Sequence, residues 1–223
     1  MSRIMQRSMA LLLFLGTGFS QSDEQLKVDG EIPRAIHEIH SRLFNNYYGF
    51  KRANAPEGFI IGRGLAFFPL PAPSIDELLT TMACSADAIV VAAIGTSEAS
   101  LASDEQSTFT DSLAKIREVV KDNPKQNLSP DRVIVIGRPG GEVEVQPGKK
   151  FRVIDENSPP FAKGGGEYLI FMHYVEESKQ YISTGDIYKV EGTSFKAVDS
   201  PDVGQYDFSR LKAIARDASC QRK

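Results

Sequence analysis

The chain has 223 residues, a formal net charge of -3, two cysteines and no tryptophan. Its hydrophobic fraction of 41% and charged fraction of 25% lie at globular averages, which excludes a disordered or collagen-like chain. Two cysteines are too few for a disulfide-dense small scaffold or a zinc ribbon. Because the basic residues are scattered and the charge balance is slightly acidic, we expect no nucleic-acid partner.

The first 20 residues have the order of a secretory signal. Arg3 and Arg7 form a positive start, residues 8–15 (SMALLLFL) are an apolar run, and residues 16–20 place small residues where cleavage after Ser20 requires them. The apolar run is too short to cross about 30 Å of hydrocarbon, and the alternative to a signal is a buried N-terminal helix. Cleavage changes the net charge from -3 to -5 over 203 residues, because both arginines are lost. We therefore predict a secreted or periplasmic mature protein without a membrane span.

Two short helices are expected ahead of the strands. Over residues 31–44, apolar side chains recur at spacings of 4, 3 and 4 residues, which indicates an amphipathic helix. Residues 45–73 are rich in proline and glycine and are expected to be irregular. Ser74 and Glu77 form a capping box, so a second helix should run from there to about Cys84.

Strand patterns dominate the chain from Ala88 onward. Residues 88–94 (AIVVAAI) are nearly continuous in small and β-branched apolar side chains, which is typical of a strand buried on both faces. Further strands, separated by turn residues, are expected at 132–136, 142–145, 151–154, 167–174, 180–184, 187–190 and 194–198. A last amphipathic helix is expected at about 207–219. Strands at this spacing predict a sheet that closes into a barrel or folds as a sandwich.

Residues 110–121 (TDSLAKIREVVK) fit two patterns. Leu113, Ile116 and Val120 recur at helical spacing, and the Ala, Lys, Arg and Glu of the segment favour a helix. Alternation through Ala114, Ile116 and Val120 also allows a strand. Intrinsic propensity by itself favours the helix.

The three histidines are the candidates for metal ligands. His37 and His40 lie three residues apart on one face of the first expected helix, and Glu38 follows the first of them. The metalloprotease pattern needs histidines four residues apart, so this spacing falls one residue short. His173 lies in an expected strand among core residues. Surface histidines, or histidines satisfied within a packing helix, fit these positions better than ligands do, and we expect no metal and no cofactor.

Short matches to catalytic motifs lack the companion elements that would give them meaning. Ser112 and Lys115 match the S-x-x-K pattern of penicillin-recognising enzymes, but the sequence has neither Ser-Asp-Asn nor Lys-Thr-Gly. Residues 95–99 resemble a nucleophile elbow without its second glycine, and residues 140–150 do not have the spacing of a phosphate-binding loop. The sequence therefore predicts no catalytic set.

Cys84 and Cys220 permit one intramolecular pairing. In an oxidising compartment a disulfide is the favoured interpretation, and two buried free thiols are the alternative. The bridge would close a loop of about 137 residues, for which the chain-entropy model gives about 5 kcal/mol of stabilisation.

Several short motifs occur between Cys84 and Ile182. They are CSADAIVV (84–91), PGG (139–141), PFAKG (160–164), GEYLIF (166–171) and QYI (180–182). With them, the segment from Cys84 to Val198 resembles a group of secreted bacterial proteins with an OB-like barrel. It is more distantly similar to the netrin-like domain of tissue inhibitors of metalloproteinases. The resemblance implies a five-stranded Greek-key barrel with a helix packed on it, and it favours a strand over residues 110–121.

The sequence and this resemblance predict a mainly β chain, with an OB-like five-stranded Greek-key barrel, an N-terminal helical and irregular extension, and a C-terminal helix. The predicted boundaries are residues 1–20 for the signal peptide, 21–73 for the extension, 74–200 for the barrel domain and 201–223 for the C-terminal helix.

The leading functional hypothesis is an exported, non-enzymatic β-barrel module that binds an extracytoplasmic protein, peptide or glycan. One alternative is a hydrolase whose site is assembled from distant residues, with His37, His40 and His173 as its best candidates. Another is a protease-inhibitor-like protein. The inhibitors chelate the protease zinc with a Cys-x-Cys at the mature N-terminus, whereas this chain is expected to begin at Gln21 after cleavage, so inhibition by that route is not expected.

Overall fold

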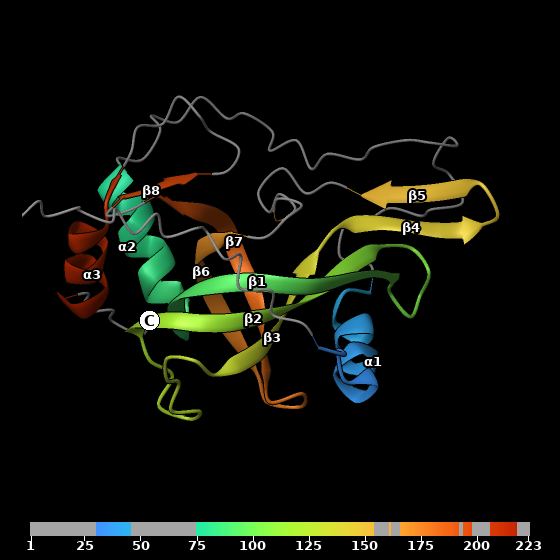
Figure 1. Ribbon diagram of the computed structural model, residues 1–223, viewed down its shortest axis with the longest axis horizontal. Coiled ribbons are helices and arrows are strands. Elements are labelled where there is room, and N and C mark those ends of the chain that lie inside the picture. The colour runs from blue at the N-terminus through green and yellow to red at the C-terminus, as the bar shows by residue number, and fades with distance from the viewer. Residues whose placement is uncertain are drawn as a thin grey trace, which may run out of the picture.

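The computed structural model describes residues 30–45, 75–153, 161, 166–191, 194–197 and 206–217 (Figure 1). The helices in this part of the chain are α1 (Arg34–Leu43), α2 (Ile75–Ser85) and α3 (Phe208–Asp217). The strands are β1 (Ala88–Leu101), β2 (Thr108–Lys121), β3 (Val133–Pro139), β4 (Gly141–Gln146), β5 (Lys149–Val153), β6 (Glu167–Val175), β7 (Gln180–Glu191), β8 (Ser194–Ala197) and β9 (Tyr206–Asp207). The expected signal segment, Ser74 of the expected capping box and residues 46–73 lie outside the described residues.

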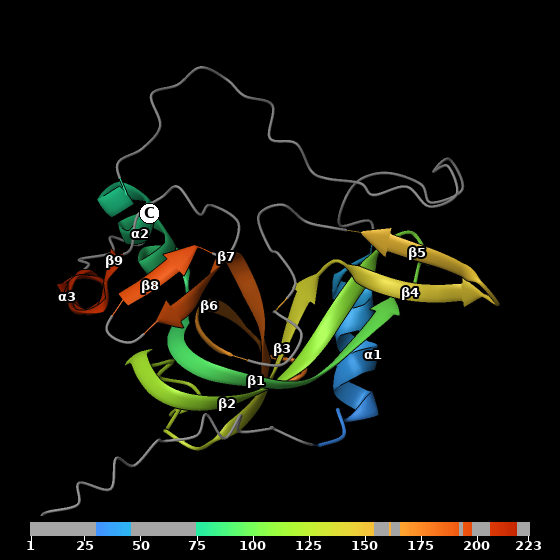
Figure 2. The same ribbon diagram turned by 45° about the horizontal axis from the view of Figure 1, so that its top comes forward.

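Five strands form a closed ring (Figure 2). β1 is antiparallel to β2 and β6, β2 is antiparallel to β3, and β6 is antiparallel to β7. The ring closes through a short parallel contact of β3 with β7, in which Ile136 lies opposite Tyr181 and Gly137 opposite Ile182. β8 and β9 extend the sheet beyond β7, and β4 and β5 form a separate two-stranded sheet. The prediction of a mainly β fold with a closed sheet and a C-terminal helix is confirmed.

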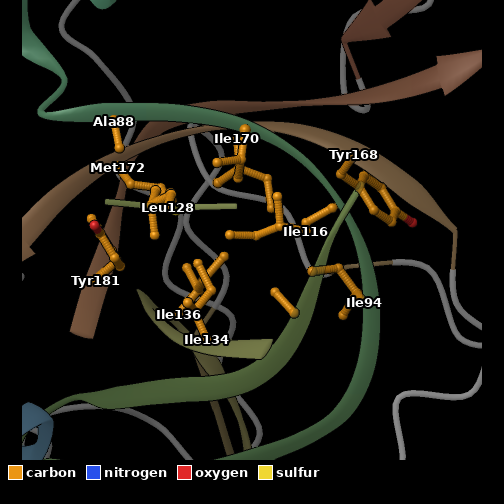
Figure 3. Packing of buried hydrophobic residues seen from close by; sticks show 13 residues of the cluster. Ala88, Ile94, Ile116, Leu128, Ile134, Ile136, Tyr168, Ile170, Met172 and Tyr181 are labelled. Atoms are coloured by element: carbon orange, nitrogen blue, oxygen red, sulfur yellow. The ribbon is translucent and has the colours of Figure 1, made fainter. Parts of the chain in front are cut away.

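The continuous apolar run of β1 is explained by burial on both of its faces. Ala88, Val90, Ala92 and Ile94 belong to the cluster inside the ring, together with residues of β2, β3, β6 and β7. Figure 3 shows Ile116, Ile136 and Ile170 of this cluster pointing toward one another. Ile89 and Val91 face the opposite side and pack in a second cluster with Leu79 of α2 and Leu211 of α3. Full burial of one such aliphatic side chain contributes roughly 1.5–3 kcal/mol, so both faces of β1 stabilise the fold.

Residues 110–121 form most of β2, so the helix that propensity favoured is wrong and the strand is confirmed. Ala114 and Ile116 point into the ring, whereas Leu113 packs on the other face against Ile32 and Val135. This period of two is what a strand between two neighbours requires. β2 is hydrogen-bonded to β1 on one side and to β3 on the other, and this pairing outweighs the weak preference of Lys, Arg and Glu for helix.

β7 is one strand where two were expected, at 180–184 and 187–190. Ile187 lies opposite Ile170 and Ser183 opposite Met172, so β7 carries extra residues opposite a single residue of β6. Such an irregularity bends a strand without ending it. β3 continues to Pro139, three residues beyond its expected end at residue 136.

The helices lie close to their expected positions, with α1 at one end of the molecule and α2 and α3 at the other (Figure 1). α1 begins after Pro33, whose extended ψ of 124° makes it the N-cap. α2 and α3 lie side by side over the outer face of β1 and β6. The Lys121 ammonium donates to the Ala83 and Ala86 carbonyl oxygens at 2.7 and 2.6 Å, which satisfies carbonyls at the end of α2.

Ile136→Ala should lower the free energy of unfolding by about 2–5 kcal/mol, because the side chain is fully buried at the strand that closes the ring. Val133→Ala, on the same strand but with 48% of the side chain exposed, should change it by no more than about 0.5 kcal/mol. Urea denaturation followed by circular dichroism measures both changes. Equal losses in the two variants would contradict the placement of the core.

Candidate functional site

The site is built around Asp111 of β2, whose side chain is fully buried. His37 Nδ1 lies 2.8 Å from Asp111 Oδ2, and His40 Nδ1 lies 2.6 Å from Asp111 Oδ1. The two histidines reach one carboxylate because residues three apart share a face of a helix. His40 is also fully buried, while His37 keeps 25% of its side chain exposed. One carboxylate thus joins α1 to the barrel through both of its oxygens.

A serine completes a chain of hydrogen bonds beyond His40. Ser178 lies in the turn between β6 and β7, and its Oγ is 3.2 Å from His40 Nε2. The same Oγ accepts the backbone N–H of Gln180 at 3.3 Å. Ser178 is buried, with 9% of its surface exposed. The described order is therefore Asp111, His40 and Ser178, contributed by three elements that are far apart in the sequence.

The donors and acceptors of this chain follow from the chemistry of the groups. An ionised carboxylate can only accept, so His37 and His40 each present an Nδ1 proton to Asp111. In a neutral His40 the lone pair then lies on Nε2, and this nitrogen accepts the hydroxyl proton of Ser178. Since the backbone N–H of Gln180 is already donated to Oγ, the Ser178 hydroxyl proton is directed toward His40.

Gly137 of β3 makes room for the cluster. A Cβ on this residue would lie 2.7 Å from His40 Nδ1 and 3.1 Å from Asp111 Oδ1. Real Cβ atoms do not approach that closely, so any larger residue would displace the imidazole from the carboxylate. Gly137 is also one of the residues that pair with β7 at the closure of the ring. The strand contact and the hydrogen-bond chain therefore meet at one position.

Contacts at its C-terminal end fix α1 further. The Phe44 and Phe109 rings stack with 5.5 Å between centroids, and the Ser107 hydroxyl donates to the Phe44 carbonyl oxygen. The backbone N–H of Ser103 donates to the Ser41 carbonyl oxygen at 3.1 Å. Together with the histidines, these contacts hold α1 against the ends of β1 and β2.

A cleft of about 560 Å³ lies between α1 and the end of β1. Its lining residues are His37, Glu38, Ser41, Arg42, Ser100, Leu101 and Ser103. Arg42 also forms an ion pair with Glu177, the neighbour of Ser178, and both of these side chains are more than half exposed. His37 belongs to both the cleft and the Asp111 cluster. The cleft therefore offers hydroxyl groups, a guanidinium, a carboxylate and an imidazole at one opening.

The predicted metal candidates are brought together only in part. His37 and His40 converge on Asp111, whereas His173 of β6 pairs instead with Asp87, with its Nδ1 3.5 Å from Oδ2 and 41% of its side chain exposed. Within the described residues, no group of three or more His, Cys, Asp or Glu side chains is arranged to hold a metal ion. Each of the two histidines on α1 is hydrogen-bonded to Asp111 through its Nδ1.

The S-x-x-K match does not assemble either. The Ser112 hydroxyl is 2.8 Å from the Ser97 hydroxyl, while Lys115 pairs with Asp131 at 3.0 Å. Residues three apart on a strand lie on opposite faces, so this spacing cannot bring the two side chains together on β2.

Asp111 and Ser178 were missed by the sequence analysis. Asp111 stands in a strand whose neighbouring residues are buried, and an acid at such a position needs partners. This was the one signal that could have found it, provided that β2 had been recognised as a strand. Ser178 lies in a polar turn, Glu176–Lys179, and nothing local distinguishes it from other turn serines.

Cys84 lies near the end of α2 and is disulfide-bonded, and the described residues contain no free cysteine. Cys220, its predicted partner, lies outside the described residues, so this pairing stays a prediction.

The structure also bears on membrane insertion. Of the helices it describes, none combines the length and the apolar character needed to cross a bilayer.

Comparison of the chain with protein-family models, with curated proteins and with solved structures finds no match.

Asp111→Ala should lower the free energy of unfolding by about 3–5 kcal/mol, because two histidines lose their acceptor and one of them is fully buried. Glu142→Gln, which weakens an exposed pair with Lys150, should change it by no more than about 1 kcal/mol. Chemical denaturation measures both. A loss in Asp111→Ala no larger than that of the control would show that the cluster does not anchor α1.

Peptide mapping of the purified protein without reduction should yield one disulfide-linked pair containing Cys84 and Cys220, because Cys84 is disulfide-bonded and the sequence offers it one intramolecular partner. Alkylation before reduction should label neither thiol. A disulfide-linked dimer through Cys84, or labelling of Cys220, would contradict the pairing.

Proposed function

We propose that the chain is an exported binding module whose barrel is OB-like. The support for the barrel type is the order of the closed ring, β1-β2-β3-β7-β6, with its parallel closing contact. This is the order expected of a five-stranded Greek-key barrel. The support for export is the order of charge, apolar run and small residues in the first 20 positions.

The cleft between α1 and the end of β1 is the binding site in this proposal. The observation that supports it best is that a cleft of about 560 Å³, lined by serine, arginine and histidine side chains, lies beside a helix fixed by a buried carboxylate. A fixed wall reduces the entropy lost when a ligand binds. The serine hydroxyls and the Arg42 guanidinium match the hydroxyl, amide and carboxylate groups of a peptide or a glycan. The ligand classes are therefore an extracytoplasmic protein segment, a peptide or a glycan.

The proposal is tested by screening the secreted protein against a peptide array and a glycan array, followed by titration of the strongest ligand. Ser100→Phe, which fills the cleft, should raise the Kd of that ligand at least about tenfold, which corresponds to a loss of about 1.4 kcal/mol or more of binding free energy. Arg210→Ala on α3, a helix at the other end of the molecule from α1 (Figure 1), is the matched control and should leave Kd unchanged.

If Ser100→Phe leaves the Kd of the strongest ligand unchanged, that ligand binds outside the cleft. The absence of any ligand in both arrays would overturn the binding proposal itself.

A second candidate function is hydrolysis, and one observation favours it. The order Asp111, His40, Ser178 is the order in which an orienting carboxylate, a general base and a nucleophilic hydroxyl are connected in acyl-transfer enzymes.

A further inference from the structure

The geometry points to a further activity: Ser178, His40 and Asp111 form a serine acyl-hydrolase site that acts on esters of short acyl groups. This inference rests on the second candidate function and names its residues and substrate class. It is independent of the cleft as a binding site, because a ligand can occupy the cleft whether or not Ser178 reacts.

The distances match the roles of a nucleophile and its base. Ser178 Oγ lies 3.2 Å from His40 Nε2, which is the upper end of hydrogen-bond reach and usual for a site without substrate. His40 Nδ1 lies 2.6 Å from Asp111 Oδ1, so the imidazole is held in the tautomer that leaves Nε2 free to take a proton. Both of these groups are fully buried, and their interaction is therefore poorly screened by water.

His37 holds Asp111 in place, and Asp111 in turn positions His40. A catalytic His–Asp pair must keep the carboxylate ionised and fixed while the imidazole gains a proton. The Nδ1 proton of His37 binds Asp111 Oδ2 at 2.8 Å, so both carboxylate oxygens are held and the acid cannot rotate away from His40.

Ser178 and His40 do not line the cleft, so we place access to Ser178 at the ion pair beside it. Arg42 lines the cleft and pairs with Glu177, the residue beside Ser178. Both side chains of this pair are more than half exposed, and an ion pair of this kind contributes little to stability. Breaking it therefore requires little free energy. Because Ser178 itself is only 9% exposed, a short acyl group fits this route better than a bulky one.

The reaction balances with water as its second substrate. Ser178 Oγ attacks the carbonyl carbon of the ester while its proton passes to His40 Nε2, and a new O–C bond forms. The ester C–O bond then breaks, and the leaving alcohol takes the proton from His40. A water molecule gives a proton to His40 and attacks the acyl-serine, which releases the carboxylic acid and returns the proton to Ser178.

The experiment uses the mature protein with two probes, p-nitrophenyl acetate and a fluorophosphonate that reacts with activated serines. The wild type should take up one fluorophosphonate per chain, at Ser178, and hydrolyse the ester. Ser178→Ala should lose the label and at least about 100-fold in kcat/KM. Ser183→Ala is the matched control, because Ser183 is equally buried, at 8% exposed, and its hydroxyl contacts no described hydrogen-bond partner.

Asp111→Asn separates a catalytic role from a structural one. It should lower kcat by about 100-fold or more with KM little changed, since the carboxamide no longer fixes the tautomer of His40. Thermal unfolding shows whether this variant is folded, and if it is not, the labelling of Ser178 and the Ser178→Ala rate still decide. Absence of a label at Ser178, or a Ser178→Ala rate equal to that of Ser183→Ala, overturns the inference. Loss of turnover in Ser178→Ala with unchanged ligand binding in the cleft would support the hydrolase and leave the proposed binding function standing.

Discussion

Closure of the ring by the parallel contact of β3 with β7 is the constraint on which the rest of the structure depends. β3 and its neighbour β2 lie on one side of that contact. β7, with the β6–β7 turn that comes just before it, lies on the other side. Without closure, Asp111 of β2 and Ser178 of the turn would belong to opposite ends of an open sheet. Gly137 stands at the contact itself, where a Cβ would collide with His40. Closure of the barrel and packing of the polar cluster therefore both depend on the position of β3 at Gly137.

The closed barrel buries the carboxylate of Asp111, and the polar cluster supplies the hydrogen-bond donors that this carboxylate needs. Asp111 is a carboxylate at a buried strand position, and such a group is tolerated only with donors at both oxygens. The histidines of α1 supply these donors, so the helix is attached by directed bonds in addition to the apolar contacts of Ile32. Apolar contacts would allow α1 to slide, whereas two hydrogen bonds to one carboxylate fix its register. The cleft beside α1 owes its shape to this attachment.

Sequence reasoning found most elements but few of the long-range relations. The positions of the strands followed from alternation and turn residues, and the double-sided burial of β1 followed from its unbroken apolar run. Propensity failed at residues 110–121, because hydrogen bonding to strands on both sides outweighs intrinsic preference. It also divided β7 into two strands, because a polar stretch in the sequence looks the same whether it turns or only bulges.

The amino-acid sequence by itself determined that His37 and His40 share one face of a helix, since a spacing of three residues imposes this on any α-helix. Only the tertiary structure decided what that face meets. His40 is 71 residues from Asp111 and 138 residues from Ser178 along the chain, so no local pattern relates them. The closing of the ring sets these distances in space, because it fixes which strand ends lie beneath α1. A pair of histidines that fails as a metal motif thereby becomes the donor pair of a buried carboxylate.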